Sequence, residues 1–352
     1  MILHLMIFSK TSREYVKFLK KYFSKESHKF VLWKGNDSHQ MELEGLDDIE
    51  ILENKKDLFY FYLTLFKLKK YEKIIIHGWY YPYFSIPLFF NKFLLKRIYW
   101  CMWGADVYIL FKKKTKLTEK IYYCFDSYCK SNIKTYLTHI IEEYYLLKQK
   151  YKIKGKIVDT FMYPSNAYKE QNTELVEKKG LFIQVGNSAE ERNHLEVLRN
   201  LVLSKDKIEK IYLPLSYGDS ENYINILLKR IPNELKDKTV PILKIMPYEK
   251  YIKFLSKIDI AIFPFKEQQA FGNIISLLAL KKTVYLEKSS ITYNCINRMG
   301  IKVKTFEQFN KLEKFGDVIL EKNKNIIKER FSEKKLIDDW KKIFRDEENE
   351  KD

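Results

Sequence analysis

The stretch LFIQVGNSAEERNH, from Leu181 to His194, decides the fold expected for the second half of this chain. An apolar run of strand type ends at Gly186, small polar residues follow, and a helix-like segment then opens. A strand, a small-residue turn and a helix N-terminus are the parts with which an α/β protein binds phosphate, because free N–H groups and the helix dipole point at one anion. An ordinary turn in which Asn or Ser caps the helix uses the same residue types and is more common. The residues that would bind an anion here are Gly186, Asn187, Ser188, Asn193 and His194.

Two strand-to-helix turns further along the chain carry polar residues of unusual kinds. One holds Tyr217, which either stacks on a nucleobase, bonds a phosphate or is a turn aromatic without a role. The other precedes the helix-like run at 274–280, and its glutamines are either ligands or exposed helix-start residues; it contains Gln268, Gln269, Gly272 and Asn273. Because the carboxyl ends of parallel strands meet at one edge of a sheet, the three turns are expected to converge on one ligand.

Length and composition limit the class of protein. A chain of 352 residues suits two domains, and 46% hydrophobic with 16% aromatic residues excludes a disordered chain. The 4 cysteines show neither CxxC pairs nor zinc spacing, and residues 1–4 lack the charged start of a secretory signal, so a reducing cytoplasm is expected. The apolar region Trp79–Leu95 is interrupted by Pro82 and Pro87 and does not have the pattern of a membrane span.

The formal net charge of +18 calls for an anionic partner or a compositional explanation. Lys, Ile, Asn and Tyr are all abundant, as in proteins from AT-rich genomes, so part of the lysine can be solvated surface. Between Lys55 and Lys120, however, basic residues alternate with large aromatic ones, which is how a protein binds an anionic membrane surface. Membrane docking is therefore favoured over a neutral surface. Nucleic acid ranks third, because the chain shows no known nucleic-acid-binding module.

Strand and helix patterns alternate along almost the whole chain, which predicts an α/β protein with parallel sheets and right-handed crossovers. A first domain is expected over 1–164 and a second over 180–331, joined by the polar segment Pro164–Gly180. A C-terminal segment, 332–352, contains an amphipathic helix at 332–344 that is expected to pack back across the domains. First-domain strands are expected at 2–8, 30–33, 49–52, 73–77, 98–102, 133–137 and 157–162, with helices at 12–23, 57–70 and 139–150. Second-domain strands are expected at 181–185, 208–213, 240–245, 258–263 and 283–286.

Two such domains facing a central cleft, without an Asp-x-Asp metal motif, indicate a nucleotide-sugar glycosyltransferase of the GT-B type. Five motifs carry a more specific resemblance: HGWYYP (77–82), WCMWGADVY (100–108), VGNS (185–188) followed by Asn193–His194, PLSYG (214–218) and FPFKEQQAFGN (263–273). Their order resembles the family 56 glycosyltransferases, the TDP-4-acetamido-4,6-dideoxygalactose (TDP-Fuc4NAc):lipid II transferases of enterobacterial common antigen synthesis. The resemblance covers roughly residues 1–286, and WGADVY with the QQAFG turn are its most specific parts.

The resemblance implies a dTDP-sugar donor bound by the C-terminal domain and an acceptor saccharide on undecaprenyl diphosphate. It also implies a cytoplasmic protein that is peripheral on the inner face of the bacterial inner membrane. Neither a cofactor nor a metal is expected, so helix dipoles, N–H groups and a few side-chain donors must neutralise the diphosphate. His194, beside the donor loop, is expected to bind phosphate rather than to move a proton.

Direct displacement at the anomeric carbon needs a base for the acceptor hydroxyl, and the first domain is expected to supply it. Asp106 follows a strand and a Gly-Ala turn, and it is the first candidate; its plainer role is to cap the helix that follows. His77, at the end of the preceding strand, is the second candidate. The aromatic residues expected to bind the acceptor are Trp79, Trp103 and Tyr108.

Two other functions stay open at this point. A nucleotide-sugar 2-epimerase shares the two-domain architecture but needs several acid and base residues, and the chain has only 6 histidines. A basic nucleic-acid-binding protein would lose affinity steeply with salt. The paired glutamates of many retaining GT-B enzymes are absent, since Ile275 stands where the second would follow Glu267; this favours a base-assisted displacement.

Overall fold

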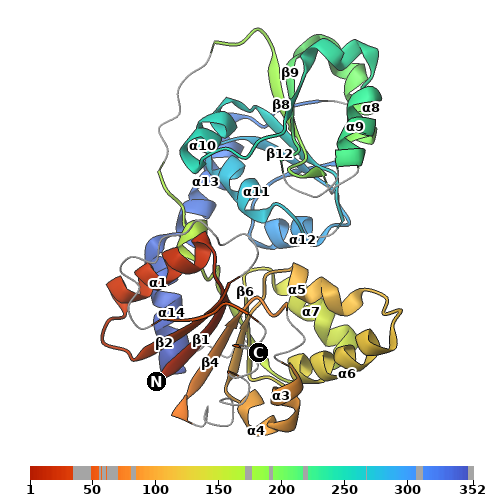
Figure 1. The fold of residues 1–352 in the computed structure, drawn as a ribbon. Coiled ribbons are helices and arrows are strands. Elements are labelled where there is room, and N and C mark those ends of the chain that lie inside the picture. The colour runs from red at the N-terminus through yellow and green to blue at the C-terminus, as the bar shows by residue number, and fades with distance from the viewer. Residues whose placement is uncertain are drawn as a thin grey trace. The chain divides into compact units, whose positions relative to one another are not determined.

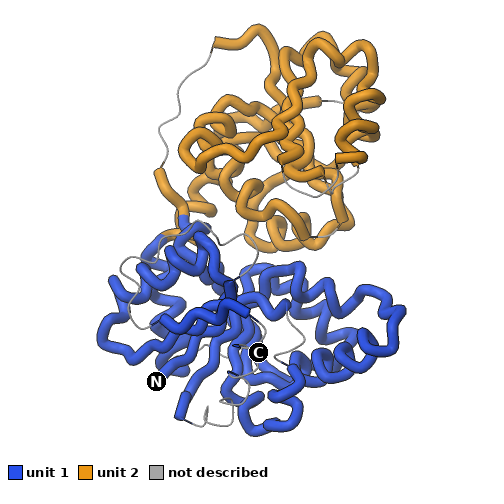
Figure 2. The backbone as a smooth tube through the Cα atoms, in the orientation of Figure 1, with its two compact units in different colours: residues 1–167, 333–352 blue, residues 168–332 orange. Residues whose placement is uncertain are grey.

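The computed structural model describes residues 1–34, 49–54, 57, 61, 70–80, 85–170, 177–189, 193–216, 221–266, 268–306 and 312–347. The chain divides into two compact units, which Figure 2 colours separately. Unit 1 is Met1–Ala167 with Glu333–Asp352, and unit 2 is Tyr168–Ser332. Tyr217 and almost all of the helix expected at 57–70 lie outside the described residues.

Unit 1 contains a parallel sheet with the strand order β3-β2-β1-β4-β5-β6-β7. Its strands are β1 (Ile2–Ile7), β2 (His28–Trp33), β3 (Ile49–Leu52), β4 (Lys73–His77), β5 (Ile98–Cys101), β6 (Thr135–Thr138) and β7 (Lys156–Asp159). Its helices are α1 (Lys10–Tyr22), α3 (Ser85–Phe90), α4 (Lys92–Leu95), α5 (Ala105–Tyr108), α6 (Leu117–Ser131), α7 (Ile141–Tyr151) and α14 (Glu333–Arg345).

Side-chain alternation along the strands builds two different layers in unit 1. On one face, Leu3, Ile74 and Trp100 belong to an apolar core that also takes in Leu94 of α4 and Leu147 of α7. The opposite face carries the alternate residues of each strand and is covered by α1 and α14, both visible beside β1 and β2 in Figure 1. Alternation therefore decides which strand residues meet which helices.

The helix α14 belongs to unit 1, although it is the last helix described in the chain. Its Trp340 ring lies 5.1 Å from the ring of Tyr15 in α1, and the Trp340 Nε1 donates to the carbonyl of Met162 at 2.9 Å. Lys73 of β4 donates to the carbonyls of Ile343 and Phe344 at its C-terminal end. These contacts attach α14 to the face of the sheet that α1 also covers.

Unit 2 contains a parallel sheet with the strand order β10-β9-β8-β11-β12-β13. Its strands are β8 (Leu181–Val185), β9 (Ile208–Pro214), β10 (Thr239–Ile242), β11 (Ile260–Phe263), β12 (Thr283–Leu286) and β13 (Lys304–Thr305). Its helices are α8 (His194–Leu201), α9 (Glu221–Lys229), α10 (Tyr248–Lys257), α11 (Phe271–Ala279), α12 (Ile291–Arg298) and α13 (Asp317–Arg330).

The expected fold class is confirmed: each unit is a doubly wound α/β layer structure with a parallel sheet. The strands expected at 49–52, 73–77, 181–185 and 283–286 have those bounds in the structure. The strand expected at 157–162 ends earlier, at Asp159, because the apolar residues after it are buried beneath α14 instead of continuing the ladder. The long helix α6 and the two-residue strand β13 were missed by the sequence patterns.

Candidate functional site

In unit 2 the strand order reverses between β8 and β11, which lie side by side although β9 and β10 come between them in sequence. Ligands of doubly wound folds bind beyond the carboxyl ends of the strands at such a switch point. Two of the three turns singled out in the sequence follow these strands. The structure therefore brings the Gly186 turn and the Gln268–Gln269 turn to the same point of the sheet, while Tyr217 lies outside the described residues.

The turn after β8 depends on a backbone conformation that favours glycine. Gly186 has φ 66°, and its N–H donates to the carbonyl of Ile262 in β11 at 2.9 Å. A side chain at this position would be strained in that conformation. The turn thus leaves the strand at a defined angle and places Asn187 and Ser188, both half-buried, beyond the sheet edge.

A side-chain network joins the two turns. The Asn187 Oδ1 accepts from the Nδ2 of Asn273, in the first turn of α11, and from the Tyr251 hydroxyl of α10 at 3.1 Å. The Oδ1 of Asn273 is buried and has no hydrogen-bond partner among the described residues. Polar groups from three elements converge beside one helix N-terminus.

Two helices begin at this edge without a side-chain cap among the described residues. Asn193 stands at the N-cap of α8, but its Nδ2 donates to the carbonyl of Pro264 at 2.6 Å instead of its oxygen capping the helix. Ala270 stands at the N-cap of α11 with φ 53°, and Gly272 in the first turn is exposed. Gln268 and Gln269 are half-buried just before this helix. The positive ends of two helices that lack a side-chain cap form an environment for an anion.

The structure buries His194 at the first residue of α8. Its ring is 1% exposed, and its Nδ1 is 3.0 Å from the Tyr223 hydroxyl. Burial lowers the pKa of His194 to about 4. The imidazole is therefore neutral at physiological pH and offers a phosphate no positive charge. It contacts Tyr223 of α9 from the first residue of α8.

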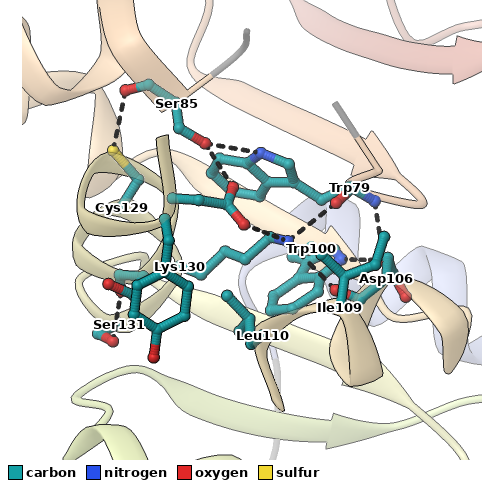
Figure 3. Close-up of polar contacts among 12 residues, drawn as sticks. Trp79, Ser85, Trp100, Asp106, Ile109, Leu110, Cys129, Lys130 and Ser131 are labelled. Carbon is teal, nitrogen blue, oxygen red and sulfur yellow. Dashed lines mark hydrogen bonds and ion pairs between the residues drawn. The ribbon is translucent and has the colours of Figure 1, made fainter. Parts of the chain in front are cut away.

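In unit 1, Asp106 is the centre of a buried hydrogen-bond network (Figure 3). Its Oδ2 accepts from the backbone N–H of Trp79 at 2.8 Å and from the Trp100 Nε1 at 2.6 Å. Its Oδ1 accepts from the backbone N–H of Trp103 at 2.9 Å. One carboxylate thereby connects β5 with the segments that follow β4 and β5, which explains why the WGADVY stretch contains an aspartate.

This environment contradicts the expectation that Asp106 is the general base. The side chain is fully buried, and both of its oxygens accept hydrogen bonds from the protein. Burial raises the pKa of Asp106, while Lys130 and the three N–H donors pull it down. With both oxygens already accepting N–H bonds, this carboxylate holds two loop segments in place and has no unused oxygen to offer an acceptor hydroxyl.

Lys130 of α6 supplies the balancing charge. Its Nζ contacts the Oδ2 of Asp126 at 2.9 Å and donates to the carbonyls of Trp79 and Asp106 at 2.9 and 3.2 Å. Ser85 closes the network, donating to Asp126 and accepting from the Trp79 Nε1. Figure 3 shows Lys130 reaching between the two tryptophan-bearing segments. Removal of this charge would leave carboxylates buried without compensation.

His77 is the second expected base that the structure places elsewhere. It lies on the sheet face covered by α1 and α14, is 1% exposed, and its Nδ1 is 2.7 Å from the Tyr163 hydroxyl. The Trp103 Nε1 can only donate, and it donates to the same hydroxyl at 2.7 Å. The other ring nitrogen of His77, Nε2, lies 3.2 Å from Nδ1 of His4. Both nitrogens of His77 therefore have partners inside unit 1, and neither is free to take a proton from an acceptor.

Two more histidines continue this network. Nε2 of His77 lies 3.2 Å from Nδ1 of His4, and Nε2 of His4 lies 3.0 Å from Nδ1 of His28, so each ring can hydrogen-bond to the next. Burial lowers the pKa of His77 to about 3 and that of His28 to about 4, and burial together with its neighbours lowers that of His4. Three neutral imidazoles form one hydrogen-bonded chain inside unit 1.

The aromatic residues expected at the acceptor site divide into two groups. Trp79 is 0% exposed and packs edge-on against Trp100 with ring centroids 5.9 Å apart, so it belongs to the core and cannot contact an acceptor. Trp103 and Tyr108 remain half-buried. Trp103 packs against Tyr80, whose ring would also meet a side chain at Gly78, where φ is 73°. Trp103 and Tyr108 are the two that can still line an acceptor site.

Glu143 was not singled out from the sequence, and the structure places it at the same edge. It lies in the first turn of α7, is 1% exposed, and receives a hydrogen bond from Tyr108. Burial, together with the charge of Asp106, raises the pKa of Glu143 to about 8. An acidic residue in a first helical turn is too common to draw attention in a sequence. Nothing in the sequence indicated a role for Tyr251 either, because α10, which carries it, is distant in sequence from the Gly186 turn that it contacts.

The surface of unit 1 carries exposed apolar residues beside cations. Phe90 is 70% exposed and Phe93 54%, and Leu117 at the start of α6 is 73% exposed. The Arg97 guanidinium lies 4.7 Å from the centroid of the Phe93 ring. No helix in the described parts of the chain has the length and apolarity to cross a membrane. Within the same residues, no group of three or more His, Cys, Asp or Glu side chains is arranged to hold a metal ion.

Comparison with known proteins identifies a family. Residues 12–326 match the family described as 4-alpha-L-fucosyltransferase, glycosyl transferase group 56. The matched range takes in most of both units and every candidate site residue expected from the sequence.

Solved structures share the fold across nearly the whole chain. A glycosyltransferase from Rickettsia africae ESF-5 is 16% identical with a TM-score of 0.62, over 98% of this chain and 97% of that one. Anabaena HepE, in complex with UDP and glucose, is 11% identical with a TM-score of 0.64, over 98% and 100%. WaaG, a glycosyltransferase involved in lipopolysaccharide biosynthesis, is 8% identical with a TM-score of 0.60, over 97% and 98%. The fold is that of the GT-B glycosyltransferases.

Proposed function

Because this chain belongs to glycosyl transferase group 56, we propose that it transfers Fuc4NAc, or a similar deoxyamino sugar, from a dTDP-sugar to a saccharide carried on undecaprenyl diphosphate. That the chain is a glycosyltransferase follows from its family and fold. The family description names a fucosyl group, and Fuc4NAc is likewise a 6-deoxygalactose. The reaction would serve the synthesis of a surface polysaccharide such as enterobacterial common antigen.

The observation that supports a nucleotide-sugar donor most directly is the pair of uncapped helix N-termini at the switch point of unit 2. The helices α8 and α11 follow neighbouring strands, and the Asn187–Asn273 hydrogen bond joins their turns. A diphosphate presents two charged groups and many acceptor oxygens, which suits two helix dipoles with amide donors between them. We place the donor diphosphate here, with Gly186, Asn187, Ser188, Gln268, Gln269, Gly272 and Asn273 as its binding residues.

Metal-independent binding of the diphosphate is part of the proposal. Two partial positive charges and a set of N–H donors can neutralise a leaving diphosphate without a cation. Transfer should then continue in the presence of EDTA at a rate equal to that with added Mg²⁺. Loss of transfer in EDTA, with recovery on adding Mg²⁺, would refute this part alone.

Unit 1 is proposed to bind the acceptor and an anionic membrane surface. Half-buried Trp103 and Tyr108 at the sheet edge suit a saccharide, which packs readily on aromatic faces. Exposed Phe90 and Phe93, with exposed Lys92 on α4, Lys96 after it and lysines on the segment before α6, suit the interfacial region of an anionic bilayer. The protein would then be peripheral on the cytoplasmic face of the membrane that holds its acceptor.

The donor assignment is tested by thermal unfolding with nucleoside diphosphates. A ligand at 100 times its dissociation constant stabilises the folded protein by about 2.7 kcal/mol, which raises the melting temperature measurably. We expect dTDP to raise it more than UDP or GDP does. UDP is the sharpest comparison, because the structurally similar HepE was solved with UDP.

A variant in the first turn of α11, with a matched control, tests where dTDP binds. Asn273→Asp keeps the size of the side chain but places a negative charge at the start of α11, so it should weaken dTDP binding at least tenfold through repulsion. Asn294→Asp, on α12 of the same unit, is the control and should bind dTDP as the wild type does. A larger shift with UDP would refute the thymidine donor, and no shift with any nucleoside diphosphate would refute a nucleotide-sugar enzyme.

A further inference from the structure

Three neighbouring strands of unit 1, β4, β5 and β6, end at one edge of the sheet. Tyr80 follows β4, Trp103 and Tyr108 follow β5, and Glu143 follows β6 in the first turn of α7. Burial raises the pKa of Tyr80, and the charges of Asp106 and Glu143 raise it further, which shows that these groups are close. The edge thus brings half-buried Tyr80 and Tyr108 close to the Glu143 carboxyl group, and half-buried Trp103 packs against Tyr80.

One oxygen of Glu143 has an unusual position. The side chain is 1% exposed, and its Oε1 has no hydrogen-bond partner among the described residues. The Tyr108 hydroxyl donates to the same carboxyl group. A buried carboxyl oxygen without a partner destabilises the fold by about 1–3 kcal/mol, so such groups are rare in native structures and concentrate where a ligand completes them.

Asp106 and Glu143 occupy contrasting environments a short distance apart. Asp106 accepts three N–H bonds and stabilises the backbone around it. Glu143 receives one bond and has its other oxygen unused. Where two carboxyl groups in one site differ in this way, the group with fewer partners and the higher pKa is the one suited to exchange a proton.

We infer that Glu143 is the catalytic base that receives the proton of the acceptor hydroxyl, and this inference rests on the proposed glycosyl transfer. In the step, the acceptor oxygen forms a bond to the anomeric carbon and its proton passes to the Glu143 carboxylate. The bond between that carbon and the diphosphate oxygen breaks, and the nucleoside diphosphate leaves with the electron pair. No oxidant, reductant or further reactant is needed.

The pKa of the Glu143 carboxyl group suits a general base. A general base works best when its pKa is near the working pH, and burial raises the pKa of Glu143 to about 8. The ionised fraction, and with it the rate, should rise as pH increases towards that value. The charged and titratable groups around Glu143 are Asp106 and Tyr108 on α5, Tyr80 after β4, Glu142 on its own helix, and the Lys130–Asp126 ion pair of α6 beyond Asp106.

The test compares Glu143→Gln with the control Glu142→Gln, which removes the neighbouring carboxyl group on the same turn. Transfer is measured with dTDP-, UDP- and GDP-sugars and a short prenyl-diphosphate-linked saccharide. We expect Glu143→Gln to lower kcat by about 10²–10⁴-fold while the dTDP-induced rise in melting temperature is unchanged. The wild-type kcat/KM for acceptor should rise about tenfold per pH unit below pH 8, and the variant should lose that dependence.

A second measurement uses the wild-type protein, so it does not depend on whether a variant folds. In wild-type protein carrying ¹³C in its glutamate carboxyl groups, one resonance should titrate at about pH 8 and shift when the acceptor saccharide is added. Titration of every glutamate below about pH 6 would overturn the inference. Transfer by Glu143→Gln within threefold of wild type would also overturn it. Absence of transfer by the wild type from all three nucleotide sugars would instead overturn the proposed function.

Discussion

Asp106→Asn separates a structural carboxylate from a catalytic one. The substitution keeps the size of the side chain and removes its charge. In the wild type, Oδ2 accepts from the Trp79 N–H and the Trp100 Nε1–H, and Oδ1 accepts from the Trp103 N–H. An asparagine has one acceptor oxygen and one NH₂ group, so in either orientation at least one of these donors faces another donor.

The magnitude follows from those three bonds. One buried N–H left without an acceptor costs about 1–3 kcal/mol, and hydrogen bonds to a neutral oxygen are roughly half as strong as those to a carboxylate. Lys130 keeps its ion pair with Asp126, so the lost charge does not leave it unpaired. We expect unit 1 to lose about 3 kcal/mol of unfolding free energy, a large share of the stability of an ordinary domain.

Urea unfolding followed by tryptophan fluorescence measures this loss. All 5 tryptophans lie in unit 1, so the signal reports that unit. Asp159→Asn, an exposed carboxylate at the end of β7, is the control and should change stability by less than about 0.5 kcal/mol. If Asp106→Asn unfolds at the same urea concentration as wild type but loses transfer by about 10²–10⁴-fold, Asp106 is the base and our reasoning is wrong.

Three further outcomes are expected. The buried histidine chain keeps its stabilising effect above the unfolded pKa of about 6.5 and loses it as pH falls towards the lowered folded values, so His28 and His77 should each cost unit 1 about 2 kcal/mol between pH 7 and pH 5; an equal urea midpoint at both pH values would contradict this. Gly78→Ala should destabilise unit 1 by about 1–3 kcal/mol, because φ is 73° and the new Cβ would lie 2.6 Å from a Tyr80 ring carbon. An unchanged urea midpoint would contradict this and show that the segment adapts freely. Replacing Phe90 and Phe93 together with Ser should weaken sedimentation with phosphatidylglycerol vesicles at least tenfold without changing dTDP binding; unchanged sedimentation would remove this surface from the membrane proposal.

The lysines proposed from the sequence for membrane contact are not equivalent. Lys112, Lys113 and Lys116 are exposed, whereas Lys114 is half-buried and donates to the carbonyls of Ile109 and Lys112. Only the first three are free to approach phospholipid headgroups. Neighbouring identical residues were indistinguishable in the sequence, because their exposure depends on how the segment folds back on itself.

The turns proposed to bind the donor could largely be located from the sequence. A strand that ends in glycine and small polar residues is a local pattern. Because parallel strands end at one edge of a sheet, several such patterns together predict where in the fold their turns lie. Gly186, Asn187 and Asn273 were found in this way, and the structure joins their turns. Tyr251 was missed, because the helix that carries it contributes a single residue, and no local pattern distinguishes that residue from its neighbours.

The acceptor side was predicted less well, for a different reason. Asp106 and Trp79 follow strands and His77 ends one, as site residues do, but their side chains are buried and bonded within the protein. For a residue near a strand end, alternation decides which face it occupies, and distant segments decide what covers that face. Glu143, which has the features of a base, lies in a turn that the sequence marked only as the start of a helix.

By itself, the sequence determined the two α/β halves, the strands that build them and the polar turns of the second half. Hydrophobic periodicity and turn chemistry act over a few residues, so they can be read along the chain. Only the tertiary structure decided that Asp106 is a buried acceptor of three N–H groups, that α14 closes over the histidine chain, and that Glu143 keeps an unpartnered oxygen. The free energy and pKa of a buried polar group depend on partners far away in sequence, and those partners exist only once the chain has folded.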